Sequence, residues 1–283
     1  MCLFLKKLII DKSLFESTLP SPQKLLEFAH NHFLILPDVL YFECATALQR
    51  EEQLLELFRN VILNGAYRCE SWWSIIKKEA RELLPYGPLV DLSEVEAVRN
   101  TFRNNHTPYN PEDAKELLSR HREVAKELMC SIDDFDKKIS FNSPEVHKEI
   151  RKWDGSRKRK PERLCGWAFW VDSEDIHKLA VAWLSDLTNN IGQYCLSKDW
   201  FTWQYLRLFM ILRFEMNFLK HKWGPLGMDS IEHDLQDIQY VALLARAEGL
   251  LTKDRGCASL AKAAFPEKDV FSSIDEVTED YRC

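Results

Sequence analysis

Four carboxylates that lie far apart in the chain each follow or accompany a strongly apolar run. Asp11 follows an apolar triplet, and Asp254 closes a short run that resembles a buried strand. Glu43 and Asp237 lie in apolar segments with helical character. Carboxylates gathered in one place repel one another, and a hard divalent cation with oxygen ligands relieves that repulsion. The pattern therefore predicts a site for Mg²⁺ or Mn²⁺ and metal-assisted hydrolysis of a phosphodiester bond.

Each of these acids also has a structural interpretation when it is taken alone. Asp11 and Asp254 could simply be turn residues, and Glu43 could face solvent. Asp237 is harder to dismiss, because the residues that follow it place it beside a buried helix face. Asp234, three residues earlier, is either a fifth ligand or the N-cap acceptor of that helix, and the cap interpretation is slightly favoured.

The elements that would position these residues alternate between strands and helices at both ends of the chain. Short apolar runs predict strands at 6–10, 33–36, 250–252 and 270–274. Apolar periodicity and capping residues predict helices from Pro22 and at 37–63, 71–84, 111–128, 173–196, 199–221, 229–248 and 257–265. Asn64-Gly65 and Gly249 are expected to stop two of them. The alternation predicts an α/β fold with a parallel sheet flanked by helices, and the middle of the chain is expected to be mainly helical.

Four ordered segments resemble the PIN-domain family of metal-dependent nucleases. Residues 8–15 resemble the first strand with its Asp, and 36–43 resemble the early helix with an inward Glu. Residues 237–245 resemble the late helix that opens on an Asp, and 250–254 resemble the strand that ends in Thr-x-Asp. The first segment departs from the family pattern, because Lys12 stands between the Asp and Ser13.

This resemblance implies a PIN-like core in which Asp11, Glu43, Asp237 and Asp254 are the catalytic, metal-binding residues. It covers the two ends of the chain and predicts a discontinuous core made of 1–63 and 228–283. Residues 64–227 would supply the remaining core helices together with a large, mainly helical insertion. The family does not assign a role to that insertion.

Charge bears on the expected partner. The chain has a formal net charge of −6, whereas a nucleic-acid-binding protein is usually basic. Metal-binding acids lower this count, and basic residues are locally dense within 151–163. The candidates for substrate binding are Lys253, Arg255, Arg157, Lys158, Arg159 and Lys160. The resemblance favours RNA as substrate, with DNA as the next choice.

Other features restrict the class of protein. No apolar stretch is long enough to cross a membrane, and the N-terminal segment lacks the features of a signal peptide. The 8 Cys are scattered and form no CxxC pair, which argues against a structural zinc site and favours reduced thiols in the cytoplasm. The Trp-rich stretch 164–223 is interpreted as core packing rather than as a platform for bases.

Two other functions remain open at this stage. The chain could be a catalytically silent PIN-like scaffold that binds a protein through its helical insertion. It could also be a toxin held inactive by an antitoxin or another regulatory protein. His233 is interpreted as a surface residue, with a metal neighbour or a proton shuttle as the alternative. The sequence gives no indication of oligomeric state.

Overall fold

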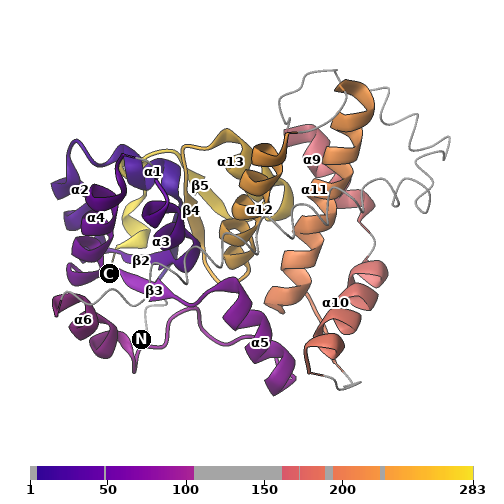
Figure 1. Cartoon of the computed structure of the whole chain (residues 1–283), viewed down its shortest axis with the longest axis horizontal. Helices are drawn as coiled ribbons and strands as arrows, with labels where there is room; N and C mark the ends of the chain where they lie inside the picture. Colours follow the sequence, from indigo (N-terminus) through magenta and orange to yellow (C-terminus); the bar gives the residue numbers. More distant parts are fainter. Residues whose placement is uncertain are drawn as a thin grey trace.

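A parallel sheet forms the centre of the molecule. The computed structural model describes residues 5–47, 49–104, 161–171, 173–188, 194–223 and 227–282. Within these ranges five parallel strands pair in the order β3-β2-β1-β4-β5. Their bounds are β1 Lys7–Ile10, β2 Phe33–Pro37, β3 Tyr67–Cys69, β4 Gly249–Leu251 and β5 Asp269–Phe271. The predicted α/β class with a parallel sheet flanked by helices is confirmed (Figure 1).

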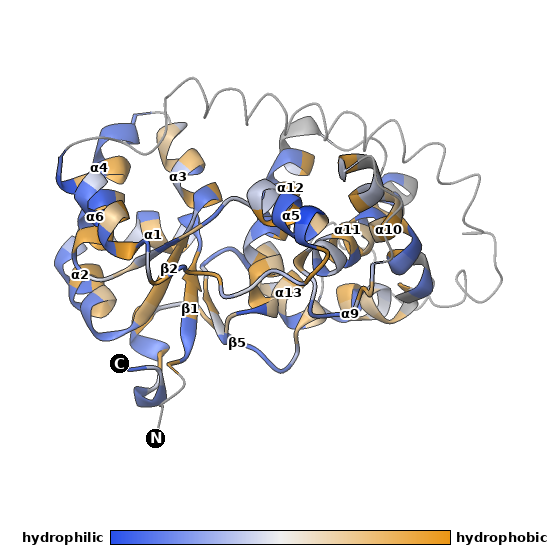
Figure 2. Cartoon of the chain, turned by 90° about the horizontal axis from the view of Figure 1, so that it is seen from below, coloured by the Kyte–Doolittle hydropathy of each residue, from blue (hydrophilic) through white to orange (hydrophobic). Residues whose placement is uncertain are grey.

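The middle strand joins the two ends of the chain. Ile9 of β1 pairs with Ile35 of β2 on one side and with Leu250 of β4 on the other. All five residues of β2 are buried, as are Leu8 to Ile10 in β1. Strands covered on both faces carry continuous apolar runs, which is why these segments were recognisable in the sequence. Figure 2 shows hydrophobic strand residues lying between helices whose outer turns are hydrophilic.

Helices connect and cover the strands. They are α1 Lys12–Ser17, α2 Pro22–Asn31, α3 Asp38–Ala45, α4 Glu51–Leu63, α5 Trp72–Glu82, α6 Val95–Arg103, α9 Pro161–Trp170, α10 Ser173–Thr188, α11 Phe201–Trp223, α12 Met228–Ala242 and α13 Arg255–Ala264. Figure 1 shows α2, α4 and α6 at one end of the molecule and α9, α10 and α11 at the other. Helices α12 and α13 lie between the sheet and this second group (Figure 1). None of the described helices combines the length and apolar character needed to cross a membrane.

Two predicted helices differ in the structure, although the stop expected at Asn64-Gly65 is confirmed by the end of α4 at Leu63. The helix expected over 37–63 is broken between α3 and α4, where Gln49 has a φ of 69°. A left-handed residue cannot continue a right-handed helix. Gly249 does not stop a helix but begins β4, after α12 and a short 3₁₀ turn at Leu243–Ala245. A Cβ at Gly249 would lie 2.9 Å from Leu8 Cδ2 and 3.3 Å from the ring of Phe271, so any larger residue would require these side chains to move.

Other differences come from short or partly exposed elements. The edge strand β3 was not predicted, because it has only three residues and includes Arg68. The sequence of α10 is apolar on more than one face, which predicts a buried helix, but Leu179 is 44% exposed and Lys178 is exposed. The predicted helix at 111–128 lies outside the described residues, as does most of the charged stretch 133–163, whose composition predicts an exposed loop. The end of that loop, 161–163, instead begins α9.

The aromatic residues of the second half pack into the core, as the sequence indicated. Trp167 and Trp200 are fully buried, and Trp167 stacks on Phe214 with ring centroids 5.5 Å apart. Trp167 Nε1 donates to Glu215 Oε2 at 2.9 Å. The same carboxylate accepts from Arg163, and both charged side chains are 1% exposed. Arg163 therefore belongs to a buried ion pair and not to a surface that could contact a substrate.

Candidate functional site

Asp11 lies directly after β1, and its two carboxylate oxygens accept hydrogen bonds from two different segments of the chain. Its side chain is the N-cap of α1 and accepts from the backbone N–H of Leu14 at 3.0 Å. Its other carboxylate oxygen accepts from the hydroxyl of Thr252 at the end of β4. Asp11 is 4% exposed. The carboxylate is thus buried where β1 and β4 end, and it is more than a surface turn residue.

Asp254 lies three residues after the end of β4 and, like Asp11, caps the helix that follows its strand. It is the N-cap of α13, and its Oδ1 accepts from the N–H groups of Gly256 at 2.6 Å and Cys257 at 2.9 Å. The N-terminal end of a helix stabilises negative charge, so Asp11 and Asp254 both occupy favourable positions for a carboxylate. Their strands run parallel, and the two acids therefore lie at the same, carboxyl edge of the sheet.

Ser13 connects these two acids. Its Oγ lies 2.9 and 3.0 Å from the two carboxylate oxygens of Asp11, so its single hydroxyl hydrogen is shared between them. The same oxygen accepts from the backbone N–H groups of Lys253 at 2.8 Å and Asp254 at 2.9 Å. Ser13 therefore connects the segments that follow β1 and β4, as the hydroxyl of Thr252 also does. The departure from the family pattern at Lys12 does not displace Ser13 from Asp11.

Glu43 reaches the same region from α3. It is 7% exposed, and the hydroxyl of Tyr240 on α12 donates to its Oε2. The solvent-facing interpretation is therefore wrong. Burial raises the pKa of Glu43 to about 7, although the hydrogen bond from Tyr240 and the nearby Lys12 ammonium both oppose this.

Asp237 lies in the interior of α12 and is 4% exposed. Because this helix begins at Met228, Asp237 does not open it, and a favourable interaction with the N-terminal end of the helix does not apply. The N-cap is Gly227, so the cap interpretation of Asp234 is also wrong. Asp234 is 6% exposed and lies one turn before Ile238.

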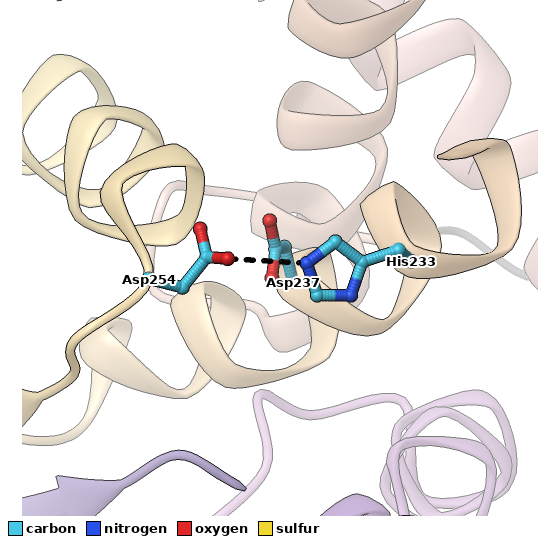
Figure 3. A group of neighbouring side chains, drawn as sticks. All are labelled: His233, Asp237 and Asp254. Atoms are coloured by element: carbon cyan, nitrogen blue, oxygen red, sulfur yellow. Dashed lines mark hydrogen bonds and ion pairs between the residues drawn. The ribbon is translucent and has the colours of Figure 1, made fainter. Parts of the chain in front are cut away.

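His233 brings an imidazole to this edge, as Figure 3 shows. Its Nε2 lies 3.2 Å from Asp254 Oδ2, and its side chain is 54% exposed. His233, Asp237 and Asp254 each offer one ligand atom, and these atoms all lie within 4.8 Å of one another. Among the described residues this group does not include Asp11, Glu43 or Asp234.

The four predicted acids nevertheless share one electrostatic environment. Burial raises the pKa of the Cys257 thiol, and the charges of Asp237, Asp11, Asp254 and Glu43 each raise it further. Burial also raises the pKa of Asp11, against the hydrogen bonds from Thr252, Leu14 and Ser13. Asp254 differs, because the hydrogen bond from His233 lowers its pKa to about 2. Burial therefore disfavours the ionised forms of Asp11 and Glu43, and a cation beside these two acids would stabilise their ionised forms.

The basic residues predicted to bind substrate are only partly placed. Lys253 and Arg255 are exposed on either side of Asp254. Arg157, Lys158, Arg159 and Lys160 lie outside the described residues. Arg163, at the end of the same basic run, is buried against Glu215, so this part of the expected basic rim is wrong.

Sequence reasoning undervalued three residues at this site. His233 was interpreted as a surface residue, yet its spacing from Asp237 is four residues, which places both on one helix face. That spacing was a usable signal. The contacts of Ser13 with Asp254 and of Tyr240 with Glu43 had no such signal, because they join segments 241 and 197 residues apart.

Protein-family models, curated proteins and solved structures were compared with this chain, and none of them matches it. Function therefore has to be inferred from the side chains at the carboxyl edge of the sheet. These are carboxylates on separate elements, largely desolvated, with an imidazole beside them.

Proposed function

We propose that this protein is a metal-dependent nuclease with a PIN-like core that hydrolyses phosphodiester bonds, with RNA favoured over DNA. One observation carries the proposal: Asp11, Glu43, Asp237 and Asp254, on four different elements, lie in one environment at the carboxyl edge of a parallel sheet. Ligands of open α/β sheets bind at this edge. A purely structural role would not require four acids from distant segments to be placed together.

The donor chemistry at this edge fits a divalent cation. Carboxylate oxygens are the ligands that Mg²⁺ and Mn²⁺ prefer. Asp11 and Glu43 are buried, and burial raises the pKa of each, so their ionised forms need a nearby positive charge. Lys12 and His233 supply only part of this positive charge, because the pKa of Glu43 stays raised although both cations lower it. We assign Asp237 and Asp254 as direct ligands, and Asp11 and Glu43 as ligands of the ion or of its bound water.

A bound Mg²⁺ or Mn²⁺ would lower the pKa of a water molecule and stabilise charge on the phosphate. The residues of the chain have separate tasks around it. Ser13 and Thr252 hold the carboxylate of Asp11 in one orientation by hydrogen bonds. Tyr240 does the same for Glu43. Lys253 and Arg255, exposed beside Asp254, are placed to attract the phosphate backbone of a polynucleotide.

Cleavage of labelled RNA tests the proposal. Single-stranded RNA, single-stranded DNA and duplex DNA are incubated with the whole chain in Mn²⁺, in Mg²⁺ and in EDTA. We expect metal-dependent cleavage, greatest with RNA, that is abolished in Asp237→Asn and in Asp11→Asn. The matched control is Asp269→Asn. Asp269 is an exposed acid at the N-terminal end of β5, away from the carboxyl edge of the sheet. Its hydrogen-bond partner Tyr281 can still donate to the amide oxygen of the asparagine.

Two results would contradict the assignment. Cleavage that persists in Asp237→Asn would show that the activity arises elsewhere or from a contaminant. No cleavage by the folded wild-type chain, together with no metal binding that depends on Asp237, would favour the silent scaffold. Absence of cleavage with metal binding retained would point to a nuclease held inactive until a regulatory partner is present.

A further inference from the structure

His233 and the two nearest carboxylates form a compact set of donors from two elements. His233 and Asp237 lie one turn apart on the same face of α12. Asp254 comes from the loop between β4 and α13. In Figure 3 the imidazole is directed at Asp254, and the carboxylate of Asp237 lies beside them. The set therefore contains a nitrogen donor in addition to carboxylate oxygens.

The separation of the donors suits a shared cation. Two ligand atoms that are each about 2.1 Å from one ion lie roughly 3.0 Å apart at a right angle and roughly 3.4 Å apart at a tetrahedral angle. His233 Nε2 and Asp254 Oδ2 are 3.2 Å apart, between these two values. The ligand atom of Asp237 lies within 4.8 Å of both, so the three donors surround one small volume.

An ion pair between His233 and Asp254 does not by itself account for this arrangement. An ion pair at a half-exposed position contributes little to stability and needs only two partners. The third member, Asp237, is 4% exposed and also acts electrostatically on His233. A cation accounts for all three groups, because it neutralises two carboxylates and is coordinated by the imidazole nitrogen.

We propose that His233 is a direct nitrogen ligand of the bound ion, together with Asp237 and Asp254, and that the site consequently prefers first-row transition ions to Mg²⁺. This inference rests on the proposed nuclease function and identifies its metal. Imidazole nitrogen binds ions such as Co²⁺ and Zn²⁺ well, whereas Mg²⁺ favours oxygen ligands and retains much of its water. A site made of carboxylates alone would have this preference to a smaller degree.

Metal titration of the whole chain tests the inference without an activity measurement. Co²⁺ and Mg²⁺ are titrated separately by calorimetry into the wild type, His233→Gln and the control His177→Gln. His177 is an exposed histidine on α10. We expect His233→Gln to weaken Co²⁺ binding by at least about tenfold. Loss of a residue that only orients a metal ligand already weakens binding by about this factor, and loss of a ligand should weaken it at least as much. Mg²⁺ binding should be unchanged, and His177→Gln should alter neither.

Nitrogen-15 NMR of the histidine rings provides the direct observation. With Zn²⁺ added, the Nε2 resonance of His233 should shift as expected for a metal-bound nitrogen, while the resonance of His177 stays in place. If Zn²⁺ binds in an Asp237-dependent manner but leaves His233 Nε2 unchanged, His233 is only an ion-pair partner and this inference fails, although the proposed nuclease stands. If Zn²⁺ binds to His233 Nε2 and no metal supports cleavage, the metal site stands and the nuclease proposal fails.

Discussion

The backbone N–H of Asp254 donates to the hydroxyl of Ser13 across 2.9 Å, and these residues are 241 positions apart in the chain. The same hydroxyl lies within 3.0 Å of both oxygens of Asp11. Ser13, together with Thr252, thus fixes the relative positions of two of the acids that we assign to the metal site. Removal of the Ser13 hydroxyl should disturb the site more than the fold.

Ser13→Ala is expected to weaken Mn²⁺ binding by about 10-fold to 100-fold, because loss of a residue that orients a metal ligand has this effect. The free energy of unfolding should fall by about 1 kcal/mol, since the Lys253 N–H loses its acceptor while the Asp254 N–H keeps the Thr252 hydroxyl. Calorimetric Mn²⁺ titration and urea unfolding measure the two effects. The control is Ser17→Ala, because Ser17 donates only to the carbonyl of Leu14 within α1. Equal loss of metal affinity in both variants would contradict a specific role for Ser13.

Tyr240→Phe should impair the site by releasing Glu43. The Tyr240 hydroxyl donates to this carboxylate and lowers its pKa, which burial has raised to about 7. Without that hydrogen bond the pKa rises further, so Glu43 is more protonated at pH 7 and the pH of half-maximal Mn²⁺ binding moves upward. Tyr205→Phe serves as the control, because Tyr205 is a buried tyrosine that stacks on Trp72 on another helix. An unchanged pH profile in Tyr240→Phe would show that Glu43 does not contribute to binding.

His233 should titrate at unusually high pH when no metal is added. The hydrogen bond and charge of Asp254 raise its pKa from 6.5 to about 9. Because the folded-state pKa lies above the unfolded one, the contribution to stability is fully present below pH 6.5 and is lost as the pH rises through about 9. NMR titration of the ring protons measures this pKa directly. Asp254→Asn should return it toward 6.5, and a value near 6.5 in the wild type would contradict the ion pair.

Glu215→Ala should be strongly destabilising, although Glu215 is not among the residues of the proposed site. Its carboxylate accepts from Arg163 and Trp167, and both charged residues are 1% exposed. Removing one partner of a buried ion pair leaves an uncompensated charge and lowers the free energy of unfolding by about 3–5 kcal/mol. Urea unfolding followed by circular dichroism measures this loss.

The double variant Arg163→Met, Glu215→Leu tests the cause of that loss. It removes both charges and keeps apolar volume in their place, so it should recover most of the stability. If the double variant is as unstable as Glu215→Ala, the effect comes from packing and hydrogen bonds and not from an unpaired charge.

The sequence by itself determined the central strands and the acids at their ends. Fully buried parallel strands require unbroken apolar runs, and Leu8 to Ile10 and Phe33 to Leu36 have them. Asp11 and Asp254 follow such runs and were therefore expected at one edge of the sheet. Local patterns sufficed here because burial on both faces leaves few choices of residue.

Tertiary structure decided what local patterns do not contain. Gly249 could end a helix or begin a strand, and only the structure shows that it pairs with Leu8 and lies against side chains from three other segments. Asp234 could have been the N-cap of its helix, but α12 begins at Met228, near the start expected at 229, and Asp234 lies inside it. The contacts between Ser13 and Asp254, and between Tyr240 and Glu43, form only when the two ends of the chain pair in the sheet. Their geometry depends on strand order and register, which residues distant in sequence determine together.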